Sequence, residues 1–180
     1  MRADAERNRQ RVLAAAKELI ERDGPSVPLD DIARAAGVGP GTLHRHFPSK
    51  RALLAAVIMD RLTTLTDQLT GLADSERPGE ALMAAVTRML DEGDVSEPVK
   101  AALVGTDFDL ERDAPEATER LHAALDRLLR AAQQAGEIRT DVNVHDLISL
   151  VAAAFIAEQR RPARGKPHHL TTIIFDGLRR

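Results

Sequence analysis

The segment GVGPGTLHRHFPSK, residues 37–50, concentrates the side chains of this chain that could do chemistry. It holds two of the six histidines, His44 and His46, with Arg45 between them and Lys50 shortly after. Histidines with nearby cations suggest three kinds of site: a metal site, an acid–base pair, or a surface that binds a negatively charged partner. The element that carries these residues decides among the three.

The local pattern predicts a short helix. Gly39 suits the N-cap, and Pro40 suits the first helical position, where the missing N–H of proline costs nothing. Leu43 and Phe47 lie four residues apart, which places both on the buried side of a helix. Pro48 then closes the helix.

This helix argues against a metal site. Residues two apart in a helix point about 200° away from each other, at about 3.6 residues per turn. His44 and His46 therefore cannot hold one ion together, and we expect no metal site or cofactor here. For His46, an ordinary packing role in a partly buried position remains an open alternative.

The composition predicts an all-α protein. Ala, Leu and Arg, all good helix formers, dominate the 180 residues, and runs of β-branched residues are scarce. There is no cysteine, which excludes disulfides and thiolate chemistry. The polar start MRADAERNRQ is not a signal peptide, and no run approaches the ~20 apolar residues that span a bilayer. We expect a cytoplasmic protein without a membrane segment.

Apolar spacing and glycine or proline breaks predict the helices. We expect them at about 4–22, 28–36, 40–47, 48–72, 79–92, 96–108, 114–135, 143–160 and 167–178, with Gly93 as one of the breaks. Three short helices give way to longer ones near residue 48. The sequence therefore predicts a small domain at 1–48 and a larger one at 49–180.

The second and third of these helices form a helix-turn-helix pattern: LDDIARAAG, the turn GVG, and PGTLHRHF. The third helix is short, begins with small residues and carries hydrogen-bond donors but no acid. Such a helix can enter the major groove of DNA with its N-terminal residues at the base edges. Thr42 and Arg45 share a face, and Arg45 could contact guanine with two hydrogen bonds. Lys50 is placed for a phosphate.

The stretch IARAAGVGPGTLHRHFPSKRALL resembles the DNA-binding segment of the TetR family of transcriptional repressors, and the resemblance covers residues 7–54. It implies an all-α homodimer with an N-terminal three-helix helix-turn-helix domain and a larger C-terminal helical domain for effector binding and dimerisation. It further implies a ligand-responsive repressor that binds a palindromic double-stranded DNA operator and is released by an unknown small-molecule effector.

The resemblance also assigns DNA contacts, residue by residue. Lys50 matches the phosphate-binding lysine of the family. The recognition-helix positions correspond to Pro40, Gly41, Thr42, His44, Arg45 and His46. His44 departs from the family, which commonly has a tyrosine there that donates a hydrogen bond to phosphate. Pro28 and Asp30, before this helix, also depart, since the family often has a threonine and a polar or basic residue near these positions. A carboxylate at position 30 would repel phosphate or accept a hydrogen bond from a cytosine amine.

Charge is distributed unevenly along the chain. The net charge is −3, yet residues 1–51 hold ten Lys or Arg against seven Asp or Glu, while residues 52–180 hold fifteen against twenty-one. A net positive N-terminal segment followed by a net negative remainder is compatible with an anionic partner that binds the N-terminal segment. Three arginines of the first helix, Arg7, Arg9 and Arg11, are interpreted as a solvated face, with phosphate contact as the alternative.

The larger domain offers candidate effector and dimer contacts. Adaptable or aromatic side chains suit a small apolar ligand, though they are equally ordinary core residues. The effector candidates are Met83, Met89, Phe108, His122 and Phe155. The last two long helices are the expected dimer contact, with single-chain core as the alternative, through Leu147, Leu150, Val151, Ala154 and Ile174.

Two rival functions remain. A helical-bundle enzyme would need a metal motif, a phosphate loop or a nucleophile elbow, and the single pair of Glu119 and His122 cannot build a di-iron site. A helical adaptor without a DNA role is the other rival. We expect a regulator and not an enzyme.

Overall fold

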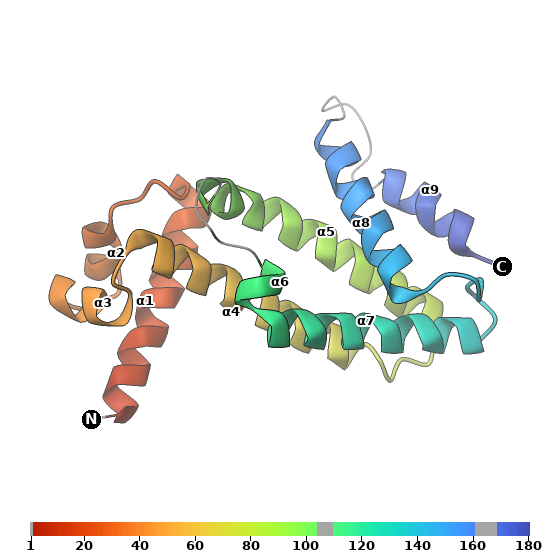
Figure 1. Cartoon of the computed structure of the whole chain (residues 1–180), viewed down its shortest axis with the longest axis horizontal. Helices are drawn as coiled ribbons and strands as arrows, with labels where there is room; N and C mark the ends of the chain where they lie inside the picture. Colours follow the sequence, from red (N-terminus) through yellow and green to blue (C-terminus); the bar gives the residue numbers. More distant parts are fainter. Residues whose placement is uncertain (1, 104–109, 161–168) are drawn as a thin grey trace. The chain divides into compact units, whose positions relative to one another are not determined.

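The computed structural model describes residues 2–103, 110–160 and 169–180, and these residues are predominantly helical (Figure 1). The predicted all-α fold is confirmed. The chain divides into two compact units. The first comprises residues 1–61 and 95–114, and the second comprises residues 62–94 and 115–180.

The helices lie close to the ranges expected from the sequence. Their bounds are α1 Arg2–Asp23, α2 Leu29–Ala35, α3 Pro40–His46, α4 Lys50–Gly71, α5 Pro78–Leu103, α6 Leu110–Asp113, α7 Pro115–Gln134, α8 Val144–Gln159 and α9 His169–Leu178.

One predicted break is wrong. The sequence predicts that Gly93 separates two helices at 79–92 and 96–108, whereas α5 continues through it to Leu103. A glycine inside a helix costs only about 1 kcal/mol relative to alanine, so a single glycine does not by itself end a helix. The end of the second predicted helix, residues 104–109, lies outside the described residues.

The first unit is built on the apolar stripe of α1. Its members are all buried, namely Val12, Leu13, Ala16, Leu19 and Ile20. They share one core with the buried side chains of α2, α3 and the first half of α4. Leu43 is completely buried in this core and Phe47 is 3% exposed, so the two anchors predicted for α3 are confirmed.

Glycine ends α1 and α2, as the sequence predicts. Gly24 has φ +82° and Gly37 has φ +62°, the left-handed conformation that other residues adopt only with strain. Gly39 is the N-cap of α3, and Pro40 is its first residue. The turn between α2 and α3 is therefore tight, and α3 begins three residues after Gly37.

Two ion pairs join α1 to α4 within the first unit. Lys17 pairs with Asp60, and Arg61 pairs with Glu21. The side chain of Arg61 is only 7% exposed, so the Glu21 carboxylate offsets a positive charge that is largely removed from water. The pairs place the middle of α4 against the C-terminal half of α1.

The second unit has a core of its own. Helices α5, α7, α8 and α9, the second half of α4 and the connection between α7 and α8 contribute to it. Its large buried side chains include Leu82, Leu125, Leu128, Leu129, Ile138 and Leu147. Asn143 and Asp146 form a capping box at the start of α8, in which each side chain accepts a hydrogen bond from the other's backbone N–H.

The connection between α7 and α8 joins two other parts of this unit. The carboxylate of Glu137 accepts a hydrogen bond from the backbone N–H of Gly79, at 3.3 Å, in the first turn of α5. Ile138 forms an antiparallel bridge with Arg179, directly after α9. A Cβ at position 79 would meet the Glu137 carboxylate, so a larger residue there would displace this side chain. Among the described helices, none combines the length and the apolar character needed to cross a membrane.

We expect Leu43→Ala to lower the free energy of unfolding by about 2–5 kcal/mol, because it removes apolar contacts and leaves a cavity in a closed core. Denaturant unfolding followed by circular dichroism measures this loss. Gln68→Ala is the control: Gln68 is exposed on α4, and its replacement should change stability by less than about 0.5 kcal/mol. Equal stability of the two variants would contradict the anchoring role of Leu43.

Candidate nucleic-acid interface

Helix α3 presents its predicted contact residues to solvent at its N-terminal end. Pro40 and Gly41 are exposed, and Thr42 is half-buried. A Cβ placed at Gly39 or Gly41 would meet open space. The backbone at this end of α3 is therefore accessible to a large partner, as close approach to DNA requires.

The central residues of α3 divide between the outside and the core. His44 and Arg45 are exposed, whereas His46 is half-buried beside the ring of Phe47, with the ring centroids 6.4 Å apart. His44 and His46 thus lie in different environments, and in the described part of the chain no three His, Asp or Glu side chains gather as a metal site. This ring contact supports the alternative that His46 is a packing residue.

Lys50 has a structural partner that its sequence context did not reveal. Its Nζ donates a hydrogen bond of 2.5 Å to the carbonyl oxygen of Val27, 23 residues earlier in the loop before α2. Burial lowers the pKa of the Lys50 ammonium below its ordinary value. An ammonium has three donors, so this bond leaves two for a phosphate.

Two arginines of α1 make contacts beyond their own helix: Arg11 is exposed, as the solvated-face interpretation expects, and Arg9 is half-buried. Nη2 of Arg11 donates a hydrogen bond of 3.1 Å to the carbonyl oxygen of Gly37. The guanidinium of Arg9 lies over the Phe47 ring, 5.6 Å from its centroid. Arg7, by contrast, pairs with Asp4 on the same helix, which agrees with that interpretation.

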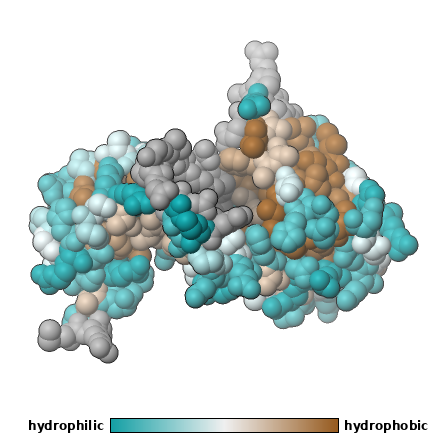
Figure 2. Space-filling view, viewed as in Figure 1, coloured by the Kyte–Doolittle hydropathy of each residue, from teal (hydrophilic) through white to brown (hydrophobic). Residues whose placement is uncertain are grey.

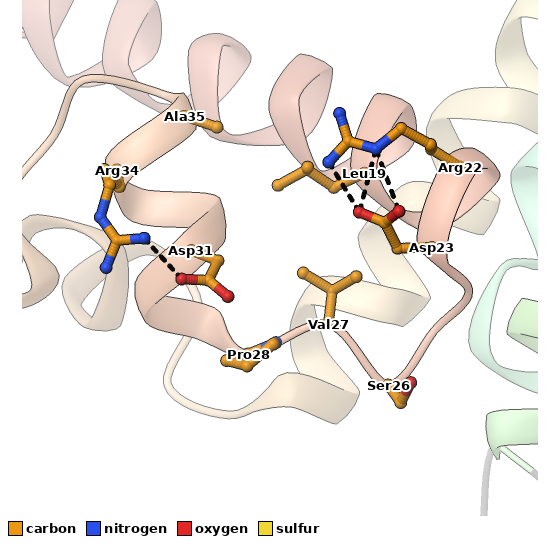
Figure 3. A pocket seen from close by; sticks show the side chains of 9 residues that line it. All are labelled: Leu19, Arg22, Asp23, Ser26, Val27, Pro28, Asp31, Arg34 and Ala35. Atoms are coloured by element: carbon orange, nitrogen blue, oxygen red, sulfur yellow. Dashed lines mark hydrogen bonds and ion pairs between the residues drawn. The ribbon is translucent and has the colours of Figure 1, made fainter.

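The first unit also has a surface cavity of about 630 Å³ between α1, α2 and the loop that joins them (Figure 3). Each wall carries an ion pair of its own: Arg22 with Asp23 on α1, and Arg34 with Asp31 on α2. The arginines neutralise the two carboxylates, and the Arg22 guanidinium holds the pKa of Asp23 below its usual range. The predicted DNA contacts on α3 do not line this cavity.

The predicted effector residues are partly buried in the second unit. Met83, Met89 and Phe155 pack half-buried against its core. His122 is also half-buried, in an edge-to-face contact with His145 at 5.9 Å between ring centroids. Phe108 lies outside the described residues. A cavity of about 350 Å³ in this unit, next to Glu137 and Phe175, is lined by other residues than these.

The predicted dimer residues lie mostly inside the single chain. Leu147, Val151 and Ala154 are buried in the core of the second unit, and Leu150 and Ile174 are half-buried against it. Their burial within one chain agrees with the alternative that they are ordinary core residues.

The large apolar side chains that are exposed on these two helices are different ones: Ile156 is 52% exposed and Ile173 is 53% exposed. Sequence reasoning missed both. Figure 2 shows hydrophobic residues gathered on the part of the second unit where α8 and α9 lie. The available signal was that the apolar residues of α8 are not confined to one stripe, which is typical of a helix covered on several sides.

Comparison with known proteins agrees with the geometry of α2 and α3. Residues 12–57 match the family described as "Bacterial regulatory proteins, tetR family". Residues 77–180 match "Transcriptional regulator SbtR-like, C-terminal domain". The two matches include α2 and α3 and most of the second unit.

Individual relatives are regulators too. The HTH-type transcriptional regulator SrpR of Pseudomonas putida is 31% identical over 98% of this chain and 78% of its own length. UidR of Escherichia coli strain K12 is 29% identical over 79% of this chain and 75% of its own length. These relatives are transcriptional regulators and not enzymes.

Solved structures are similar to this chain over nearly its whole length. A TetR transcription regulatory protein from Mycobacterium vanbaalenii has 41% identity and a TM-score of 0.78, with 99% of each chain covered. SCO0520 from Streptomyces coelicolor has 33% identity and a TM-score of 0.73, with 95% of this chain and 98% of that one covered. The chain belongs to the TetR family of helix-turn-helix transcriptional regulators.

Proposed function

We propose that this protein is a homodimeric repressor that binds a palindromic DNA operator and leaves it when a small molecule binds the larger domain. One observation carries the DNA-binding part. A short helix anchored by Leu43 and Phe47 presents Thr42, His44 and Arg45 outward and carries no acid. In a dimer, two such helices would enter major grooves about 34–36 Å apart, or at a multiple of that distance.

Phosphate contacts complete this interface. One N–H of the Lys50 ammonium donates to the Val27 carbonyl, and the other two remain for a phosphate. The proposed DNA-binding site comprises Pro40, Gly41, Thr42, His44, Arg45, His46 and Lys50. Binding to DNA from the region upstream of the protein's own gene, measured across a salt series, tests the proposal. A repressor should prefer its operator and lose affinity steeply as salt rises. Equal affinity for random DNA would remove the specific-regulator hypothesis.

Arg45→Ala should weaken operator binding by about 1–3 kcal/mol and relax the preference at one base position, if Arg45 contacts a base edge. Selection from operators randomised at each position measures the preference. Arg130→Ala is the control, since Arg130 is an exposed arginine of α7 that pairs with Asp126 in the second unit. An unchanged preference in Arg45→Ala would assign Arg45 to a phosphate or to the free surface.

Dimerisation is supported by the exposed apolar surface of α8 and α9. Ile156 and Ile173 are each more than half exposed, on helices whose other large apolar side chains are buried or half-buried. A second copy of the chain would remove them from water, and burying such a side chain contributes about 1.5–3 kcal/mol.

A charge on this surface should separate the subunits. We expect Ile156→Asp and Ile173→Asp to give monomers at concentrations where the unaltered protein is dimeric, because a carboxylate would have to be buried without a partner. Sedimentation velocity measures the mass. Gln134→Asp, at an exposed site on α7, should stay dimeric. Dimers in both isoleucine variants would place the interface elsewhere.

Effector binding in the second unit is supported by its half-buried Met83, Met89 and Phe155, whose side chains can adapt to a small apolar ligand. The second unit also contains a buried hydroxyl without a partner: Thr171 is 2% exposed, and its Oγ1 has no hydrogen-bond partner in the described structure. RolR, solved with resorcinol, has the same fold at 19% identity and a TM-score of 0.66. We infer that a ligand hydroxyl or carbonyl meets Thr171.

Thr171→Val should leave the free energy of unfolding unchanged or raise it by up to about 1 kcal/mol, because it removes a buried hydroxyl without a partner. It should also reduce the thermal stabilisation by any compound that releases the unaltered protein from its operator. Thr171→Ser, which keeps the hydroxyl, is the matched control. A thermal-shift screen combined with an operator-release assay measures both effects, and equal effector stabilisation in the valine variant would exclude Thr171 from the ligand site.

A further inference from the structure

We propose that Arg11 is a positioning residue for DNA recognition: it orients α3 by holding the turn between α2 and α3, and it does not bind phosphate. The inference rests on the proposed operator binding and adds a residue outside the recognition helix to it. Helix α1 packs against both α2 and α3 in the first unit, so its side chains can reach this turn (Figure 1).

The turn and the Arg11 side chain fit each other closely. Nη2 of Arg11 donates to the carbonyl oxygen of Gly37, 26 residues later in the chain. The backbone of the turn is also bound to α2, because the N–H of Gly37 donates to the carbonyl oxygen of Arg34 and the N–H of Val38 donates to that of Ala33. A Cβ at position 37 would lie 2.5 Å from Nη2 of Arg11. Glycine at position 37 therefore permits both the positive φ and the approach of the guanidinium.

A second arginine of α1 acts at the other end of α3. Phe47 is the C-cap of α3, and its backbone N–H donates to the carbonyl of Leu43 at 2.8 Å. The guanidinium of Arg9 covers the ring of this residue. Helix α1 therefore contacts the turn that leads into α3 and the residue that ends it.

Such supports matter because α3 has only seven residues. A helix this short is not stable by itself, and its direction is set by what holds its two ends. Contacts with base edges depend on the direction of α3, since a bidentate contact requires two donors of one side chain to meet two acceptors of the base at the same time. Attraction to phosphates depends much less on it. Loosening the turn should therefore weaken operator binding more than binding to random DNA.

The test compares Arg11→Met with Arg7→Met in the full-length protein. Both variants remove one arginine from α1, but Arg7 is exposed and pairs with Asp4 on its own helix. Affinities for the operator and for random-sequence DNA are measured across a salt series. We expect Arg11→Met to weaken operator binding about tenfold and random-DNA binding less than about twofold, with an unchanged salt slope. Arg7→Met should change neither affinity by more than about twofold.

The salt slope separates positioning from phosphate binding. Removing a single phosphate contact makes the slope of log K against log salt shallower by about 0.9. A shallower slope in Arg11→Met, with operator and random DNA weakened alike, would overturn the proposal, and so would affinities equal to those of Arg7→Met. Failure of the unaltered protein to prefer any operator would instead overturn the proposed function.

A double-mutant cycle tests the contact without relying on one variant. Gly37→Ala should weaken operator binding strongly, because of its positive φ and because the added Cβ would displace the Arg11 guanidinium from the Gly37 carbonyl. In the Arg11→Ala background this hydrogen bond is already absent, so Gly37→Ala should cost at least about threefold less than in the unaltered protein. Additive effects of the two substitutions would show that Arg11 does not hold the turn.

Discussion

Helix α3 exists because Leu43 and Phe47 are buried beneath it. Seven residues form too few backbone hydrogen bonds to offset the cost of starting a helix in water, so tertiary packing must supply the stability. The two side chains close the core that α1, α2 and α4 build. This burial fixes the position of the DNA contacts proposed on α3, since they share the helix with Leu43 and Phe47 caps its C-terminal end.

Charge in the first unit is used mainly to hold the backbone and the helices together. Lys50 and Arg11 each donate to a backbone carbonyl more than 20 residues away, at the two loops that flank α2. Lys17 and Arg61 pair with acids between α1 and α4. The net positive N-terminal segment of the chain suggests an anionic partner. In the structure, several of these cations bind backbone carbonyls or acidic side chains of the first unit and so hold together the helices that surround α3.

The second unit shows why apolar residues alone do not reveal an interface. The sequence predicts that Leu147, Val151 and Ala154 contact a second subunit, yet all three are buried within the chain, while Ile156 and Ile173 are exposed. In α8 the apolar residues do not favour one side strongly enough to tell which face points inward. That choice depends on how α8 packs against α7 and α9, its contact helices in the fold.

The sequence by itself determined the all-α class, the approximate limits of most helices, and the segment that forms the helix-turn-helix. Those features depend on local rules: apolar spacing, a proline at the first position of α3, and glycines at 24 and 37 with positive φ. It did not determine the continuity of α5 through Gly93, because a tolerated glycine and a helix end look alike in one sequence. Only the tertiary structure decided the partners of Arg9, Arg11 and Lys50, and which isoleucines stay exposed. Long side chains reach groups that are distant along the chain, and only the packing of the helices brings those groups together.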